Sequence, residues 1–251
     1  MVNILISGAK GRMGQKVFEA CAITDGVKAV CGVDIVKDLS NCNFPVYDSF
    51  NEVDCDVDVV IDFSSPIALP NLLNFAIKNK KAVVLCATGY NKEELESIEN
   101  ASKQIAVFRS ANMSLGANVL IEAVKVVAKL LSDFDVEVVE KHHNQKVDAP
   151  SGTALMIADA VKEILPEKYY LYGREGRVGK RTKDEIGIHA VRGGNIVGEH
   201  DAIFAGLNET VTLSHQATDR SVFAIGAVKA ASFVANKPAG KYNMQDLINE
   251  K

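Results

Sequence analysis

Short runs of consecutive apolar residues alternate with helical patterns from the N-terminus to about Met113. These runs do not show the every-second-residue pattern of a half-buried strand, so the strands that they predict are buried on both faces. Strands that alternate with helices at this spacing are typical of a parallel sheet with helices on both faces. The sequence therefore predicts an α/β domain, with strands at 3–7, 29–33, 57–63, 82–87 and 105–110.

The second part of the chain has a different pattern, in which glycine-bearing turns join several strand-like runs. The expected elements are helices at 115–131 and 151–165 and strands at 135–141, 186–192, 199–204 and 210–215. The polar segment 166–185 is expected to be a long loop. This order predicts an α+β domain with an open, mixed sheet and helices on one face.

Two final helices are expected at 221–235 and 244–248. Because chain termini often lie close together, these helices could return to the first domain. The expected division is a first domain at 1–113, completed by 221–251, and a second domain at 114–220.

Three glycines separate the first expected strand from the helix after it, in the sequence GAKGRMG. Gly8 ends the strand and can adopt a positive φ in a tight turn. Gly11 lets a phosphate approach the main chain, and Gly14 lets the helix pack closely on the sheet. The free N–H groups of the helix start would then hold the phosphate. The spacing G-x-x-G-x-x-G is less common than G-x-G-x-x-G, and glycines alone could serve only the turn.

Asp34 favours the binding of a dinucleotide at this turn. It ends the second expected strand, 20 residues after Gly14, where an acid usually binds a ribose hydroxyl. The first domain is therefore expected to be Rossmann-like and dinucleotide-binding. The Asp34 charge favours NADH, whose 2′-hydroxyl is free. Arg12 in the turn or Lys37 beyond the strand could neutralise the 2′-phosphate of NADPH, so both cofactors stay open.

Small polar residues also follow the later strands of this domain, in the turns DFSSP and CATGY. Because ligands of an open α/β sheet bind at the carboxyl ends of its strands, we expect these turns to line the cofactor site. Ordinary turn chemistry would explain them equally well. The expected cofactor-binding residues are Gly8, Lys10, Gly11, Arg12, Met13, Gly14, Asp34, Phe63, Ser64, Ala87, Thr88, Gly89, Ser110, Asn112 and Met113.

The segment 140–154, EKHHNQKVDAPSGTA, combines groups that transfer protons with groups that bind anions. His142 and His143 follow an apolar strand, and neighbouring side chains of a strand point to opposite faces, so no metal site is expected. Lys146 follows, and PSGT before an apolar helical pattern predicts a helix start capped by Ser151 that suits a carboxylate. These groups form an acid/base site for an anionic substrate. A solvated polar loop before a capped helix would look similar.

Composition excludes several other classes of protein. The 251 residues are 47% hydrophobic and 24% charged, which is ordinary for a globular protein. A net charge of −4 gives no basic surface for nucleic acid or an anionic membrane. No apolar stretch approaches ~20 residues, and no basic region precedes the short apolar run at the N-terminus, so a cytoplasmic location is expected. The five cysteines include no CxxC pair and are expected to be reduced thiols.

Taken with GAKGRMG, the segment 140–154 resembles the 4-hydroxy-tetrahydrodipicolinate reductase family, also called dihydrodipicolinate reductases. That family has GxxGRMG near its N-terminus and a segment of the form E-x-H-H-x-x-K-x-D-A-P-S-G-T-A, and both occur here with their spacing intact. Further stretches that resemble family signatures lie at 110–119, 192–204 and 215–231. The resemblance covers essentially the whole chain.

The resemblance implies a reductase of lysine and diaminopimelate biosynthesis. Such an enzyme transfers hydride from NADH or NADPH to the ring dicarboxylate 4-hydroxy-tetrahydrodipicolinate, which gives tetrahydrodipicolinate. His142 and Lys146 would be the catalytic residues, and which of them delivers the proton is left open. The carboxylates of the substrate would be bound by His143, Ser151, Gly152, Thr153 and Arg220. Arg220 also fits on chemical grounds, because a guanidinium binds a carboxylate bidentately, although an ordinary surface arginine at a helix start would look the same.

The family is commonly tetrameric, so a homotetramer built through the second domain is expected. Binding two ligands on two domains also suggests closure about hinges near Met113 and Arg220. Two small departures from the family, CATG in place of GTTG and Met113 in place of Phe, are expected to affect cofactor packing only. His189 and His215 are expected to be satisfied, partly buried groups, whereas His200 is given no role, and Glu140 is expected to take part in neither proton transfer nor carboxylate binding.

Two other classes of protein share some of these features. Another NAD-dependent dehydrogenase of related build would lack the combination of His142, Lys146, Ser151 and Thr153. A dinucleotide-sensing regulator would usually carry a basic DNA-binding helix, and the sequence has no evident one.

If Asp34 binds the ribose, Asp34→Ala will weaken the binding of NADH more than that of NADPH. The reason is that the carboxylate favours a free 2′-hydroxyl and repels a 2′-phosphate. Dissociation constants of both cofactors, measured by fluorescence titration of the wild type and the variant, test this. Equal losses for the two cofactors would show that Asp34 does not bind the ribose.

Overall fold

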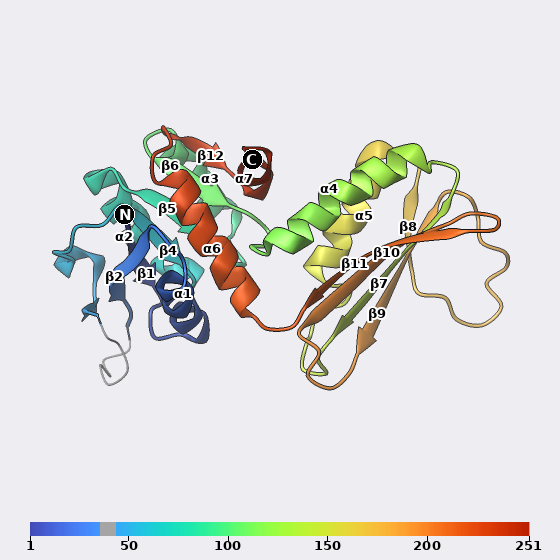
Figure 1. Cartoon of the computed structure of the whole chain (residues 1–251), viewed down its shortest axis with the longest axis horizontal. Coiled ribbons are helices and arrows are strands. Elements are labelled where there is room, and N and C mark those ends of the chain that lie inside the picture. The colour runs from blue at the N-terminus through green and yellow to red at the C-terminus, as the bar shows by residue number, and fades with distance from the viewer. Residues whose placement is uncertain (36–43, 251) are drawn as a thin grey trace. The chain divides into compact units, whose positions relative to one another are not determined.

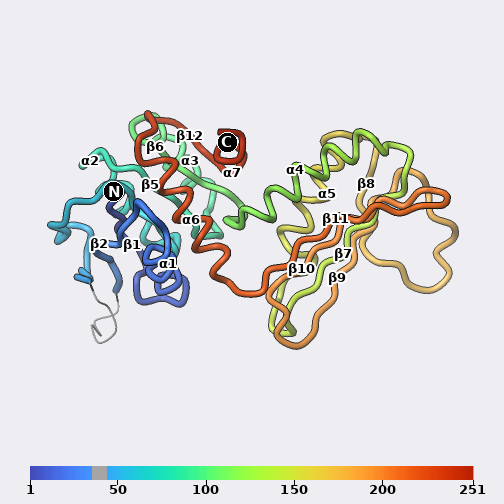
Figure 2. Tube along the Cα trace, viewed as in Figure 1, coloured from blue at the N-terminus to red at the C-terminus, as the bar shows by residue number. Residues whose placement is uncertain are grey.

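The computed structural model describes residues 1–35 and 44–250, which form two compact units. Unit 1 combines Met1–Leu115 with Arg220–Lys251, and unit 2 is Gly116–Asp219. The boundaries expected from the sequence, after Met113 and before Ser221, lie within two residues of this division. Figure 2 shows the chain leaving unit 1 once and returning to it once. Lys37 and Cys42 lie outside the described residues.

Unit 1 is built on a parallel sheet, as expected. Its strands, in the order β12-β6-β5-β4-β1-β2-β3, pair in parallel throughout the described residues. They are β1 (Val2–Ser7), β2 (Val27–Val33), β3 (Val46–Tyr47), β4 (Val59–Asp62), β5 (Ala82–Leu85), β6 (Ala106–Arg109) and β12 (Gly240–Tyr242). The helices are α1 (Arg12–Ala22), α2 (Leu69–Asn79), α3 (Lys92–Ser102), α6 (Ser221–Val234) and α7 (Met244–Asn249), with 3₁₀ turns at Phe50–Glu52 and Pro66–Ala68.

Both faces of this sheet are buried, which explains the runs of consecutive apolar residues. Ile4 and Ile6 belong to a core that includes residues of α1 and α6, whereas Leu5 belongs to a second core with α2 and α3. Alternate residues of each strand thus enter different cores. Figure 1 shows the labelled helices around the sheet. The expected doubly covered parallel sheet is confirmed.

Unit 2 is built on a mixed five-stranded sheet in the order β11-β10-β7-β9-β8. Its strands are β7 (Asp135–His142), β8 (Tyr169–Tyr172), β9 (Glu185–Arg192), β10 (Gly198–Ala205) and β11 (Thr210–Ala217). Strand β10 is antiparallel to β7 and β11, and β9 is parallel to β7 and β8. Helices α4 (Leu115–Leu130) and α5 (Gly152–Ile164) share one core with Val136, Val138 and other residues of one sheet face (Figure 1). The expected open sheet with helices on one face is confirmed.

Three short edge strands were not expected from the sequence. The prediction that 166–185 is a loop throughout was wrong, because β8 lies within it and pairs with β9. Its residues YYLY are partly or fully exposed and lack the apolar pattern of an interior strand, so their pattern does not predict a strand. Strands β3 and β12 are too short, at two and three residues, to show any period.

The loop that follows β8 is anchored to the sheet by Glu137 of β7. The Glu137 carboxylate accepts hydrogen bonds from Arg174 at 2.9 Å and from Arg181 at 3.0 Å, and it pairs with His189 at 2.7 Å. Glu137 lies on the opposite face of β7 from Val136 and Val138, since side chains alternate along a strand. This carboxylate is therefore a structural anchor on the face that α4 and α5 do not cover.

Candidate functional site

The glycine turn of unit 1 has the geometry that its sequence predicts. Gly8 has a φ of +76°, and a Cβ there would lie 3.0 Å from the Cα of Ser64. A Cβ on Gly14 would overlap the carbonyl oxygen of Gly8, so glycine is what lets α1 start against the turn. Gly11 is the N-cap of α1.

This turn has groups that fit a phosphate. Helix α1 begins without a side-chain cap, which leaves N–H groups of its first turn for another acceptor. The Nζ atom of Lys10 is buried and has no hydrogen-bond partner among the described residues. A buried amino group without a partner is costly unless an acceptor reaches it. The turn therefore fits a phosphate group, such as the pyrophosphate of a dinucleotide.

Asp34 lies beside the same turn. It follows β2, and its carboxylate accepts a hydrogen bond from the Lys10 N–H at 2.9 Å. A cavity of about 260 Å³ is lined by Asp34, Asp48, Ser64 and other residues after β1, β2 and β4. The described residues that line it include these two carboxylates and no lysine or arginine. Carboxylates suit the hydroxyl groups of a ribose better than they suit a phosphate.

Asp62, the first residue of the DFSSP turn but not among the residues expected to bind the cofactor, joins the turns after three strands. It is 1% exposed and accepts hydrogen bonds from Ser64 Oγ at 2.5 Å and from Tyr90 Oη at 3.5 Å. Burial raises the pKa of Asp62, and the hydrogen bonds from Ser64 and Ser7 oppose that rise. The sequence signal that could have identified Asp62 is its position as an acid at the end of an apolar strand. Asp62 connects Ser7, Ser64 and Tyr90, which follow or end β1, β4 and β5.

The remaining residues expected to bind the cofactor follow the carboxyl ends of parallel strands or begin α1. Parallel strands place these ends at one edge of the sheet. Ser110, Asn112 and Met113 follow β6, and the Asn112 side chain accepts a hydrogen bond from the Ser114 N–H at 2.8 Å. The others are Phe63 after β4, Ala87, Thr88 and Gly89 after β5, and Arg12 and Met13 in the first turn of α1. Their contact with a cofactor stays a prediction, as does that of Arg220 with a substrate; Arg220 is the N-cap of α6 in unit 1.

In unit 2, the centre of the segment 140–154 is Glu140, whose side chain is 0% exposed. One carboxylate oxygen accepts hydrogen bonds from the Ser151 N–H at 3.0 Å and from Arg192 at 2.7 Å. The other is 2.7 Å from His142 Nδ1 and from Arg192. The Arg192 guanidinium therefore grips Glu140 bidentately. Glu140 holds together the end of β7, the end of β9 and the start of α5.

His142 is the last residue of β7 and lies on the same face as Glu140. Burial lowers the pKa of His142, although its hydrogen bond with Glu140 opposes this. A Cβ on Gly198 would lie 3.0 Å from His142 Nε2. Glycine at position 198 therefore leaves space beside the second ring nitrogen.

Ser151 caps α5, as the sequence predicts. Its hydroxyl accepts a hydrogen bond from the Ala154 N–H at 3.2 Å and lies 2.9 Å from His200 Nε2. Ser151 is only 2% exposed, and both its hydroxyl and its N–H have protein partners. The structure thus assigns the hydroxyl to the helix cap, and its contact with a carboxylate stays a prediction.

His200 received no role in the sequence analysis, but the structure places it in this cluster. It is 4% exposed, and its ring lies edge-on to the His142 ring at 5.2 Å. Burial lowers the pKa of His200 from 6.5 to about 4, with a further contribution from nearby His142. The sequence places His200 only at the start of a strand. It does not indicate the contact with Ser151, which lies 49 residues away.

Lys146 lies on the turn between β7 and α5. Its Nζ atom is 2.8 Å from the carboxylate of Asp148, and this contact lowers the pKa of Asp148. The Lys146 side chain is 20% exposed, so it is accessible to a small molecule. Gly152 is exposed, and a Cβ there would meet nothing within 4 Å. His143 and Thr153 are half-buried on either side of the turn.

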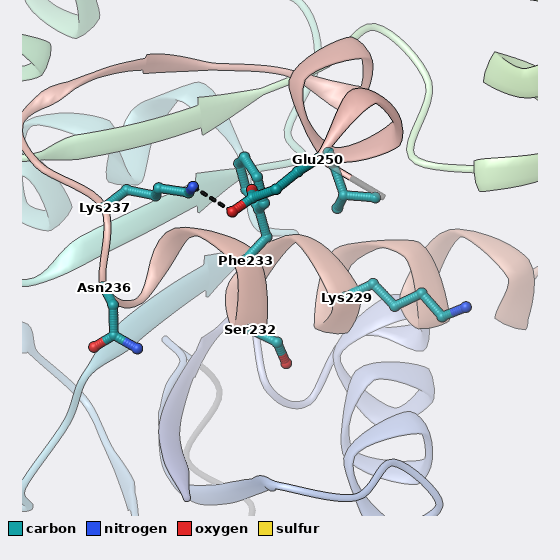
Figure 3. Close-up of a pocket in the computed structure, with 7 residues that line it drawn as sticks. Lys229, Ser232, Phe233, Asn236, Lys237 and Glu250 are labelled. Carbon is teal, nitrogen blue, oxygen red and sulfur yellow. Dashed lines mark hydrogen bonds and ion pairs between the residues drawn. The ribbon is translucent and has the colours of Figure 1, made fainter.

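Other features lie away from these two groups of residues. His189 is paired with Glu137 and half-buried, as expected. His215 is half-buried, as expected, and its hydrogen bonding stays a prediction. A cavity of about 580 Å³ is lined by Lys229, Phe233, Glu250 and neighbouring residues of α6 and α7 (Figure 3). None of the expected site residues lines it, so we assign it no role in the chemistry.

Several expectations concern groups outside the site. Among residues 1–35 and 44–250, no cluster of three or more His, Cys, Asp or Glu side chains could hold a metal ion. The cysteines of that range are free thiols. In the same part of the chain, every helix is too short or too polar to span a bilayer.

Acid should destabilise the protein partly through His200. Between pH 6.5 and about 4, His200 binds a proton in the unfolded chain but not in the folded protein, where it is buried. The free energy of unfolding therefore decreases as the pH falls through this range. From the size of the pKa shift, the loss reaches roughly 3 kcal/mol. Urea unfolding of the wild type and His200→Gln across this range tests this. The variant should lose less stability than the wild type, and equal slopes would contradict the assignment.

Comparison with known proteins gives matches along both parts of the chain. Residues 2–113 match the family model for the N-terminus of dihydrodipicolinate reductase, and residues 116–248 match the model for its C-terminus. The chain is 53% identical over 251 residues to 4-hydroxy-tetrahydrodipicolinate reductase of Caldanaerobacter subterraneus subsp. tengcongensis, covering 100% of this chain and 99% of the relative. It is 50% identical to the Clostridium tetani protein of the same name, covering 99% and 98%.

The fold also matches a solved structure. The dipicolinate-bound dihydrodipicolinate reductase of Paenisporosarcina sp. TG-14 superposes with a TM-score of 0.78 at 24% identity, covering 97% of each chain. The relatives' names and the Rossmann-like sheet with its glycine turn support an oxidoreductase, and the family supports a nicotinamide cofactor. Matched along its length by both family models, the chain belongs to the dihydrodipicolinate reductase family.

Proposed function

We propose that this protein reduces 4-hydroxy-tetrahydrodipicolinate to tetrahydrodipicolinate with NADH or NADPH, in lysine and diaminopimelate biosynthesis. The observation that carries the proposal is the Glu140 cluster, which sets His142 beside the capped start of α5. It occurs in a chain whose relatives, up to 53% identical among those compared, have the name of this reductase.

The reduced nicotinamide supplies the hydride when the cofactor is bound. The 4-hydroxyl group of the substrate has to leave as water, and the residues of this chain have to deliver a proton to the electron-rich ring. Because burial lowers the pKa of His142, His142 is largely neutral near pH 7 and is a poor proton source there. Lys146 has an accessible amino group 2.8 Å from Asp148. We therefore assign proton delivery to Lys146 Nζ and assign to His142 a hydrogen bond with the substrate.

The start of α5 would bind one carboxylate of the substrate. Gly152 and Thr153 lie in the first turn of this helix, where N–H groups and the helix dipole favour an anion. Exposed Gly152 lets a ligand approach the main chain, and half-buried His143 and Thr153 flank the turn. Arg220 would bind a carboxylate bidentately. The dipicolinate named in the Paenisporosarcina structure is a ring dicarboxylate, which agrees with this substrate class.

The cavity next to Asp34 supports a preference for NADH. Asp34 and Asp48 place two carboxylates among its lining residues, and such a site disfavours a 2′-phosphate. Arg12 is exposed in the first turn of α1 and could still bind the phosphate of NADPH. Use of both cofactors with a preference for NADH follows from this arrangement.

We also infer a cytoplasmic homotetramer without nucleic-acid or membrane partners. Strand β11 is an edge of the sheet in unit 2, with exposed residues from Thr210 to Thr212. An edge strand offers unpaired backbone groups to a second copy of the chain. The net charge of −4 does not favour anionic partners.

The direct test is an assay with enzymatically generated substrate, run with NADH and NADPH in parallel. Substrate-dependent loss of reduced nicotinamide absorbance, faster with NADH at equal subsaturating concentrations, is the expected result. Oxidation of neither cofactor in the presence of this substrate would reject the proposed function.

Lys146→Ala should lower kcat at least ~100-fold, because acid catalysis usually contributes a factor of this size. Cofactor affinity should be unchanged, since the glycine turn and Asp34 are unaltered. Steady-state kinetics and cofactor titration test both points. Lys129→Ala is the control, because Lys129 is an exposed lysine in the last turn of α4. A Lys146→Ala enzyme with near-normal kcat would remove Lys146 from the mechanism.

A further inference from the structure

The Glu140 carboxylate accepts four hydrogen bonds, although its side chain is 0% exposed. The donors are His142 Nδ1, the Ser151 N–H and two nitrogens of Arg192, at 2.7 to 3.0 Å. Each carboxylate oxygen has two of these contacts. A buried charge is tolerated when it is paired and fully hydrogen-bonded in this way.

The protonation state of Glu140 follows from its partners. Burial raises the pKa of Glu140, but the hydrogen bonds from Arg192, His142 and Ser151 together outweigh this and lower it. Near neutral pH the group is therefore a carboxylate, which has no proton to donate. His142 Nδ1, 2.7 Å away, must then be the donor. The nitrogen that gains or loses a proton is therefore Nε2.

The same carboxylate is connected to the other groups of the segment. Its bond to the Ser151 N–H ties it to the start of α5. Arg192 also donates to the carbonyl oxygen of Asp148 at 2.7 Å, and the Asp148 side chain holds Lys146. A displacement of Glu140 would thus move His142, the helix start and the Lys146 turn together.

We propose that Glu140 is a positioning residue, which fixes His142 in the Nδ1–H tautomer and leaves Nε2 as its proton-exchanging nitrogen. Arg192 is the counter-charge that keeps this carboxylate ionised. The identity of the group that contacts His142 Nε2 depends on the proposed function, whereas the Nδ1–H tautomer of His142 does not.

Several charged and titratable groups surround His142 and set its titration. Glu140 favours the imidazolium form, whereas Lys146 and Arg192 disfavour it. His200 packs edge-on at 5.2 Å and is neutral near pH 7 because burial lowers its pKa to about 4. Loss of the Glu140 charge should therefore lower the pKa of His142. A role in packing alone would not move it, because Gln has nearly the same shape as Glu.

Nitrogen NMR of ¹⁵N-histidine-labelled protein tests the tautomer. The His142 signals are assigned by their loss in His142→Gln. In the wild type, Nδ1 should carry hydrogen at every pH, and Nε2 alone should titrate. In Glu140→Gln the amide can either accept or donate, so both tautomers should be present and the pKa of His142 should fall.

Kinetics provide the second readout. Glu140→Gln should lower kcat at least ~10-fold, which is typical of losing a group that orients a reacting residue, with the KM for NADH little changed. The matched control is Glu137→Gln. Glu137 lies on the same strand with arginine and histidine partners, but on the opposite face. The Glu137→Gln variant should retain the kcat and the His142 tautomer of the wild type. The oligomeric state is measured for both variants.

Different results would overturn the positioning role of Glu140 and the proposed reaction. A wild-type His142 that carries its hydrogen on Nε2 overturns the positioning role, and this needs no variant to fold. A folded Glu140→Gln protein with unchanged tautomer, pKa and kcat overturns it too. The expected tautomer in a chain that reduces no substrate would support the role of Glu140 while rejecting the proposed reaction.

Discussion

The contact between the carboxylate of Glu140 and the guanidinium of Arg192 fixes the geometry of the whole segment 140–154. These residues come from neighbouring parallel strands, since Arg192 pairs in register with His142. Removing one partner of such a buried pair typically costs about 3–5 kcal/mol, because the other charge stays buried without compensation. The pair therefore persists only when β7 and β9 have the correct register, and that register sets His142, Ser151 and the turn of Lys146.

Unit 1 shows a second case in which a buried acid organises several turns. Asp62 accepts hydrogen bonds from the residues after β4 and β5, at the edge of the sheet that also holds the glycine turn. The two acids differ in their partners. Asp62 has hydroxyl and backbone donors, and burial raises its pKa. Glu140 has a guanidinium, and its pKa is lowered. Asp62, whose donors are hydroxyl and backbone groups, connects turns. Glu140, whose donors include a guanidinium, stays ionised and can therefore orient a histidine by accepting its N–H.

The features that could be predicted from sequence are those set by local pattern. Consecutive apolar residues predicted strands such as β4, and the steric needs of Gly14 and the cap at Ser151 followed from their neighbours. The organising contacts could not be predicted, because they join distant residues: Arg192 is 52 residues from Glu140, and His200 is 49 from Ser151. The sequence predicts no part for Glu140 in proton transfer because, within its own segment, Glu140 is only an acid at a strand end. Strand β8 was missed because an exposed edge strand needs no apolar pattern.

We propose that this chain adds a hydride from the nicotinamide and a proton from one of its own acid groups to the same ring dicarboxylate. Isotope transfer measures this most directly. With NADH deuterated at the transferred position, the product should contain one deuterium atom from the cofactor, measured by mass spectrometry. With ordinary NADH in D₂O, it should gain solvent deuterium at the carbon that Lys146 is proposed to protonate. A product without cofactor-derived deuterium, formed at a normal rate, would contradict the account.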